Sequence, residues 1–69
     1  MTAINIKLNG ETKGIPEAIN LDQLLEQFSL PKQRIAIELN GHVIRRVDWK
    51  EKTLNDGDRI EVVHFVGGG

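Results

Sequence analysis

The sequence contains no cysteine. This absence excludes disulfides, thiolate metal sites and a cysteine nucleophile, and it favours a cytoplasmic protein. Histidine is nearly absent too. The two that occur, His42 and His64, lie on different predicted strands without further ligands nearby, so we treat them as structural or surface residues and predict no metal site. Neither a catalytic triad nor a pair of catalytic carboxylates can be recognised, and we therefore expect a chain that is not itself an enzyme.

An excess of charge of one sign and a long apolar run are also missing. Nine Lys and Arg oppose ten Asp and Glu, which gives a net charge of −1 at pH 7. A chain without a basic block is a poor electrostatic ligand for nucleic acid or for a membrane surface. No apolar run approaches the roughly 20 residues of a membrane span, and the first residues lack the features of a signal peptide. We expect a cytoplasmic protein that is monomeric when free and binds neither nucleic acid nor membrane.

The hydrophobic pattern predicts two hairpins. Large apolar residues occupy every second position of the predicted strands 4–8 and 35–39. Two further predicted strands, 11–15 and 42–44, follow them. Asn9-Gly10 joins 4–8 to 11–15 and Asn40-Gly41 joins 35–39 to 42–44; Asn-Gly is typical of a type I′ turn, which needs positive φ at both central residues. The second strand contains Gly14 and ends before Pro16, so we expect it at an edge of the sheet.

One main helix is predicted between the hairpins. Asn20 is a suitable N-cap, and Gln23 three residues later completes a capping box. The stripe Leu21, Leu24, Leu25 and Phe28 has helical spacing, so the helix should run from 21 to about 28.

The chain after the second hairpin returns to a final strand. Residues 48–51 resemble a single capped turn with Asp48 as its N-cap. No other aromatic residue lies near Trp49 in sequence, so its ring should close one side of the core. Residues 55–58 should form a tight turn, and the β-branched run 60–66 should be the last strand.

The order of these elements indicates the fold class. It has neither the alternation of strand and helix of a doubly wound protein nor the even strand spacing of a sandwich. We expect an α+β fold in which one main helix crosses a mixed sheet of about five strands. The first and last strands are the most apolar, so we place them side by side and parallel at the centre of the sheet.

The chain ends in Gly67, Gly68 and Gly69, which can neither hold a strand nor fill a core. We expect residues 1–66 to form the folded domain and 67–69 to form a flexible tail. Three extended residues reach on the order of 10 Å and would fit a narrow enzyme channel. The Gly69 carboxylate is ionised at neutral pH and is a poor electrophile until it is activated. The alternative interpretation is a frayed end or an expression scar.

The order of elements before a diglycine end resembles the ubiquitin-like β-grasp fold, and most narrowly the ThiS family of sulfur carriers in thiamine thiazole synthesis. The resemblance spans the chain and is most specific in the C-terminal third, where Asp-Gly-Asp, a short apolar strand and Gly-Gly occur together. The residues that carry it are Asn40, Gly41, Val43, Arg45 or Arg46, Trp49, Leu54, Asp56, Gly57, Asp58, Ile60, Glu61, Val62, Val63, Gly68 and Gly69.

This resemblance implies a role as a protein co-substrate. A ThiF-like enzyme would adenylate the Gly69 carboxylate with ATP and magnesium, and sulfur from a persulfide donor would replace the adenylate. The resulting thiocarboxylate would supply sulfur to a ThiG-like thiazole synthase. Gly67 and Gly68 would thread into the partner enzyme, and the chain itself would bind no cofactor.

Four residues are candidates for docking to the partner. Strict alternation turns Val63 and Phe65 away from the side of Ile60, although Phe65 could instead fold back over the margin of the sheet. Arg45 and Arg46 would complement acidic groups of a partner, but such a pair is more often part of a solvated turn.

Three alternative functions are consistent with the sequence. The small subunit of molybdopterin synthase has the same fold and a Gly-Gly end, and the short length and the segment 49–69 favour the thiamine branch over it. A ubiquitin-like modifier would be joined to lysine amines of other proteins. A β-grasp binding domain with an incidental tail would keep its binding when the glycines are removed.

Overall fold

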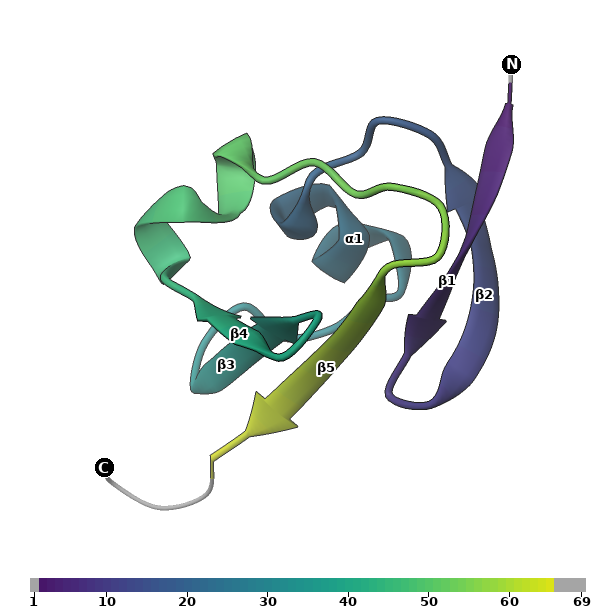
Figure 1. Ribbon diagram of the computed structural model, residues 1–69. Coiled ribbons are helices and arrows are strands. Elements are labelled where there is room, and N and C mark those ends of the chain that lie inside the picture. Colours follow the sequence, from purple (N-terminus) through teal and green to yellow (C-terminus); the bar gives the residue numbers. More distant parts are fainter. Residues whose placement is uncertain (1, 66–69) are drawn as a thin grey trace.

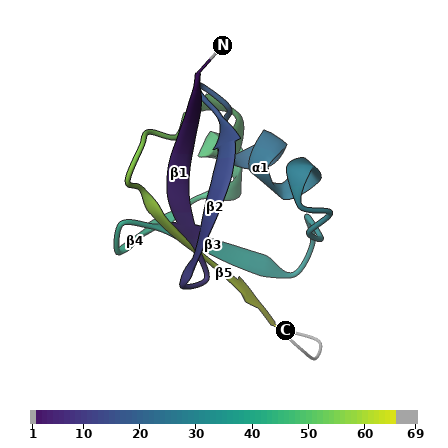
Figure 2. The ribbon, with the colours of Figure 1, turned by 90° about the vertical axis from the view of Figure 1, so that its right-hand side faces the viewer.

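A computed structural model describes residues 2–65, so Met1, Val66 and the tail 67–69 lie outside the described residues. Its elements in chain order are β1 (Ala3–Leu8), β2 (Glu11–Pro16), α1 (Leu21–Gln27), β3 (Ile35–Leu39), β4 (His42–Ile44), the 3₁₀ helix η1 (Arg46–Glu51) and β5 (Arg59–His64). The strands form one mixed sheet in the order β2-β1-β5-β3-β4, and α1 crosses one face of it (Figures 1 and 2). The predicted α+β fold is confirmed.

Both predicted hairpins are present. The central residues of each turn have positive φ, with values of 51° and 85° at Asn9 and Gly10 and of 53° and 88° at Asn40 and Gly41. The register places Leu8 opposite Glu11 and Leu39 opposite His42, as a two-residue turn requires. β2 is an edge strand as predicted, but it continues one residue further and ends with Pro16.

The central pair of strands is also as predicted. β5 pairs with β1 in parallel and with β3 in an antiparallel register of five residue pairs, from Ile35 opposite His64 to Leu39 opposite Ile60. Parallel neighbours need a long crossover, and here the helix and the second hairpin supply it. β5 begins at Arg59 and ends at His64, whereas the sequence predicted residues 60–66.

The capping box of α1 is formed as predicted. The backbone N–H of Gln23 donates to Oδ1 of Asn20 at 2.8 Å, and the N–H of Asn20 donates to Oε1 of Gln23 at 2.9 Å. Leu21, Leu24 and Leu25 are fully buried against the sheet. The helix ends at Gln27 with Phe28 as its C-cap, so it is one residue shorter than predicted.

The predicted capped turn at 48–51 is wrong in extent and in its cap. The 3₁₀ helix starts at Arg46, and its N-cap residue, Arg45, makes no side-chain capping bond. The carboxylate of Asp48 instead accepts from Nε of Arg45 at 3.4 Å, and this contact replaces the expected cap. Trp49 does close the core as predicted: its ring is buried, and its Nε1–H donates to the carbonyl of Ile44 at 2.9 Å.

Lys32 ties the loop after α1 back to the helix. Its Nζ lies 2.8 Å from Oε2 of Glu26 and 3.3 Å from Oδ2 of Asp22, two acids one helical turn apart. The hydrogen bond to Glu26 is the main cause that raises the pKa of Lys32 above its ordinary value of 10.5, while desolvation acts in the opposite direction.

We expect the two ion pairs of Lys32 to weaken as the pH rises into the alkaline range. A lysine whose pKa is raised in the folded state contributes its full stabilisation below the pKa of the unfolded state, 10.5. This contribution is lost as the pH rises through the pKa of the folded state. Lys32→Gln should therefore lower the free energy of unfolding at neutral pH, and the difference from wild type should shrink at strongly alkaline pH. Urea unfolding, monitored by circular dichroism, measures this difference in the free energy of unfolding, and the exposed Lys7→Gln serves as control. A difference unchanged at alkaline pH would contradict the assignment.

Candidate functional site

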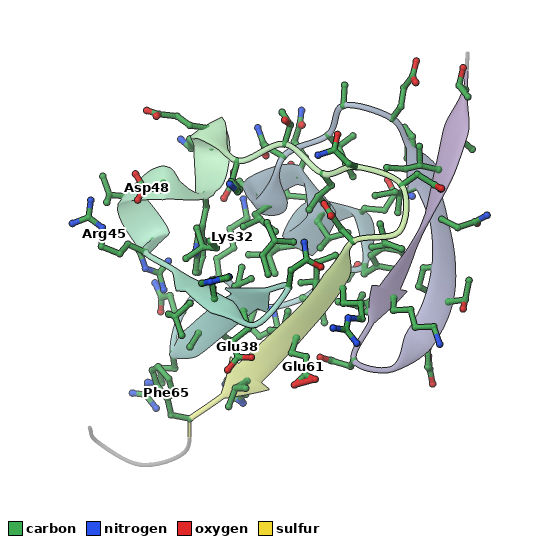
Figure 3. The ribbon with its side chains drawn as sticks, viewed as in Figure 1. Lys32, Glu38, Arg45, Asp48, Glu61 and Phe65 are labelled. Carbon is green, nitrogen blue, oxygen red and sulfur yellow. The ribbon has the colours of Figure 1, made fainter. Side chains whose placement is uncertain are left out.

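The described part of the candidate site is the strand that leads to the glycine tail. Gly67, Gly68 and Gly69 themselves lie outside the described residues. β5 carries the chain out past the other strands, and Figure 3 places Phe65 at its far end. The site is therefore described by how β5 is held and by which side chains it exposes up to Phe65.

On one side, β5 is bonded to β3 along its whole length. The N–H of Asn40 donates to the carbonyl of Arg59 at 2.8 Å, and the N–H of Phe65 donates to the carbonyl of Arg34, also at 2.8 Å. These two bonds lie at opposite ends of the register between the strands. The backbone is thus anchored up to Phe65, four residues before Gly69.

On the other side, the first hairpin holds only the beginning of β5. β1 pairs with Arg59 and Ile60 and then ends. The N–H of Asn9 donates to the carbonyl of Ile60 at 2.9 Å, and the side-chain Oδ1 of Asn9 accepts from the N–H of Val62 at 2.8 Å. The side chain of Asn9 thus makes the next hydrogen bond to β5, beyond the last backbone pair.

The second hairpin holds β5 in a similar way. Oδ1 of Asn40 accepts from the backbone N–H of Arg59 at 2.9 Å, and its Nδ2 donates to Oδ1 of Asp58 at 3.0 Å. Sequence reasoning assigned Asn9 and Asn40 only to their turns and missed this second role. The one signal in the sequence is that both turns use asparagine, whose side chain can both donate and accept.

The Asp-Gly-Asp motif fixes the entry into β5. Oδ1 of Asp56 accepts from the N–H of Asn5 at 2.8 Å, and Oδ2 of Asp58 accepts from the N–H of Asn55 at 2.8 Å. Gly57 has a φ of +87°, and its N–H donates to the carbonyl of Asn5. These carboxylates therefore stabilise the turn that the sequence predicted.

Val63 and Phe65 are exposed as predicted. They lie on the face of the sheet opposite to the fully buried Ile60 and are 51% and 50% exposed. Ala36 lies opposite Val63 on the same face, and one row further along the sheet Val43, Glu38 and Glu61 lie side by side. We call this set of residues the outer face: Ala36, Glu38, Val43, Glu61, Val63 and Phe65.

The outer face combines apolar side chains with two acids that sequence reasoning did not single out. Glu38 and Glu61 are directly opposite each other (Figure 3), and like charges in this position are mildly destabilising. Alternation along each strand places Glu38 and Glu61 on the exposed side. That they lie opposite each other depends on the register between β3 and β5, which the sequence pattern does not give.

The two arginines predicted for docking are not part of the outer face. Nε of Arg45 lies 3.4 Å from Oδ2 of Asp48, and the guanidinium of Arg46 lies over the ring of Trp49 at 4.5 Å from the centroid. Both residues sit at the start of η1, and β3 and β4 separate them from β5. Each thus has an intramolecular role, and docking by them stays a prediction.

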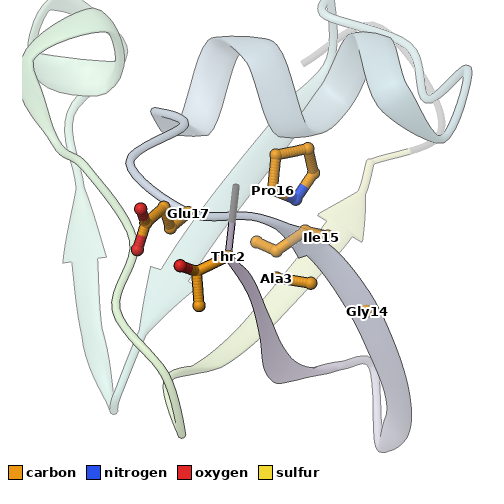
Figure 4. Close-up of a pocket in the computed structure, with 6 residues that line it drawn as sticks. All are labelled: Thr2, Ala3, Gly14, Ile15, Pro16 and Glu17. Carbon is orange, nitrogen blue, oxygen red and sulfur yellow. The ribbon is translucent and has the colours of Figure 1, made fainter.

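Other features of the described residues carry no recognisable chemistry. Within residues 2–65, no group of three or more His, Asp or Glu side chains is placed to hold a metal ion. In the same range no helix is long and apolar enough to cross a membrane. A shallow hollow at the β2 edge, far from the end of β5, is mainly apolar (Figure 4). Its lining residues are Thr2, Ala3, Gly14, Ile15, Pro16 and Glu17.

Known proteins resemble this chain along nearly its whole length. The ThiS family profile matches residues 6–69. The sulfur carrier protein ThiS of Bacillus subtilis is 35% identical over 65 residues, which are 93% of this chain and 98% of that protein. The crystal structure of the thiamine biosynthesis protein ThiS from Geobacter metallireducens has a TM-score of 0.85 at 32% identity, covering 96% of this chain and 100% of that one. A thiazole synthase of Magnetococcus marinus is 36% identical over 66 residues, although this chain spans only 20% of its length.

The two asparagine contacts predict different responses to the same substitution. Asn9→Asp keeps the acceptor for the N–H of Val62 and a side chain that tolerates positive φ, so it should be nearly neutral. Asn40→Asp replaces the donor 3.0 Å from Asp58 by a second carboxylate, and it should lower the free energy of unfolding by about 1–2 kcal/mol. Urea unfolding at neutral pH measures both variants. Equal effects of the two substitutions would contradict the contact between Nδ2 of Asn40 and the carboxylate of Asp58.

Proposed function

The chain belongs to the ThiS family, and we propose that this sulfur carrier of thiamine biosynthesis holds its sulfur as a thiocarboxylate on Gly69. The observation that carries the proposal is the family match over residues 6–69, which includes all three glycines. The solved structures that resemble the chain are thiamine biosynthesis proteins, and this favours the thiamine branch over the molybdopterin branch.

The proposed chemistry needs an activating enzyme. A carboxylate oxygen of Gly69 attacks the α-phosphorus of ATP and pyrophosphate leaves, which gives a mixed anhydride with a good leaving group. The terminal sulfur of a persulfide then attacks the carbonyl carbon and AMP leaves. The adduct now has a new C–S bond and keeps the S–S bond of the persulfide. A thiol cleaves that S–S bond, so that the acyl group keeps one sulfur as a thiocarboxylate and a disulfide is formed. Magnesium and ATP bind to the ThiF-like enzyme, which must stabilise these transition states.

The carrier contributes access to its acyl end. Gly69 has no Cβ beside the carbonyl carbon under attack, and Gly67 and Gly68 allow backbone angles that other residues resist. Three extended glycines reach on the order of 10 Å beyond the domain. Because the ladder with β3 continues to Phe65, the anchored backbone ends close to the tail, and this supports the presentation of the tail to another enzyme.

A ThiG-like thiazole synthase is the proposed acceptor of the sulfur. Relatives named thiazole synthase contain a segment similar to 96% of this chain, within proteins of which this chain spans only 20%. Joining two modules in one polypeptide raises their effective concentration toward each other. This arrangement in the relatives supports a direct encounter between carrier and synthase.

Deletion of Gly69 should abolish sulfur loading without unfolding the domain. The chain is incubated with ATP, magnesium, a ThiF-like enzyme and a persulfide donor, and intact mass spectrometry then detects the replacement of one oxygen by sulfur at the C-terminus. We expect the replacement in wild type and none in the deletion variant. Circular dichroism controls for folding, and a sulfur-loaded deletion variant would refute the assignment of Gly69.

Phe65→Ala should weaken binding to the activating enzyme more than it lowers the melting temperature. The side chain is 50% exposed on the outer face, so its removal leaves the core intact but takes apolar area from the surface beside the tail. Val47, which is 69% exposed on η1, provides the matched control as Val47→Ala. Isothermal titration calorimetry and thermal unfolding compare the two variants. A loss of thermal stability without a loss of affinity would assign Phe65 to the fold instead.

A further inference from the structure

The backbone groups of β5 alternate between its two neighbours. In an antiparallel pair, every second residue directs both its N–H and its C=O toward the partner strand. The bonds of Asn40 to Arg59 and of Phe65 to Arg34 show that odd-numbered residues of β5 face β3. The backbone groups of Ile60, Val62 and His64 therefore point to the side of β1.

The second half of this side has no partner strand. β1 pairs only as far as Ile60, and Asn9 uses its N–H for the carbonyl of Ile60 and its Oδ1 for the N–H of Val62. Within residues 2–65, the C=O of Val62 and the N–H and C=O of His64 bond to no other group. We call these three groups the β5 edge. Figures 1 and 2 show β5 running beyond the tip of the first hairpin at this point.

The β5 edge differs from the two outer edges of the sheet. β2 ends in Pro16 and carries charged side chains, and β4 has only three residues; such features protect edges from pairing with other chains. The β5 edge has no proline in the described residues. Its flanking side chains are the half-exposed Val63 and Phe65 on the outer face and the partly buried Val62 on the other. The β5 edge thus offers an acceptor, a donor and a second acceptor in strand geometry, and an extended polypeptide can pair with such a series through its own backbone.

We infer that the β5 edge binds an extended segment of the thiazole synthase as an added strand. This inference rests on the proposed function and assigns the surface through which one partner meets the carrier. The relatives that combine a segment like this chain with a thiazole synthase place the two proteins beside each other, and this selects the synthase as the occupant. An added strand would lie along the last residues before the tail and would therefore fix the direction in which Gly67 to Gly69 leave the domain.

Two substitutions at one position test the inference. His64 and Ile35 form a pair that exchanges no hydrogen bonds, so His64→Pro removes the N–H of the β5 edge without breaking a bond to β3, and proline is tolerated where the N–H faces solvent. His64→Ala removes the side chain but keeps the N–H. Against the thiazole synthase of the same source, we expect His64→Ala to bind like wild type and His64→Pro to bind about tenfold more weakly. Isothermal titration calorimetry measures both, and equal affinities would overturn the inference.

Amide exchange in the wild-type chain gives a second test that needs no variant. In an NMR exchange measurement, the amide of His64 should exchange fast in the free carrier and about tenfold or more slowly with saturating synthase. The amide of Val63 faces β3 in both states and serves as reference. A His64 amide that stays fast in the complex would overturn the inference. Protection that grows with carrier concentration alone, or that only the activating enzyme produces, would overturn the choice of occupant.

The test of the β5 edge and the test of the proposed function can fail independently of each other. Sulfur loading of Gly69 is read by intact mass and does not require the β5 edge to bind the synthase. A carrier that loads sulfur but shows no protection at His64 refutes only the added strand. A carrier that shows protection but never loads sulfur refutes the thiocarboxylate on Gly69.

Discussion

The structure depends on the hydrogen bonds that hold β5 between two hairpins. Among the strands of residues 2–65, β5 alone touches both of them, since the sheet order is β2-β1-β5-β3-β4. Each hairpin contributes the side chain of its turn asparagine as well as its strand: Asn9 bonds to Val62, and Asn40 bonds to Arg59 and Asp58. The strand that unites the sheet is also the strand that leads to the tail. The bonds that stabilise the fold therefore also set the direction of the chain up to Phe65.

The polar interactions of the described residues act mainly on the backbone. Within residues 2–65 the core consists of apolar side chains, and no polar side chain is buried. The charged side chains of the described residues lie at the surface or are only partly buried. The polar interactions act on the backbone at the capping box of α1, at the Asp56 to Asp58 turn and at β5. The domain is built to position a strand.

Sequence reasoning predicted the elements whose signals are local. Period-two alternation, the Asn-Gly turns and the capping box each act within a few residues, and all were confirmed. Where a side chain has two possible local partners, the sequence did not predict which one it binds. The Asp48 carboxylate could cap a helix or bind Arg45, and the structure shows that it binds Arg45. The second roles of Asn9 and Asn40 and the pairing of Glu38 with Glu61 depend on which strands become neighbours. A pattern within one strand does not contain that information, whereas Val63 and Phe65 follow from alternation alone.

The position of the first turn explains why β5 is both anchored and accessible. Had β1 continued in the same register, its backbone would have paired with the remainder of β5 and covered the groups of Val62 and His64. Instead the chain turns at Asn9-Gly10, and the asparagine side chain ends the ladder after a single further bond. β3 alone holds the strand from there to Phe65. A strand bonded on one side keeps its direction while its other side stays available, and the proposed presentation of the C-terminus to partner enzymes would use both properties.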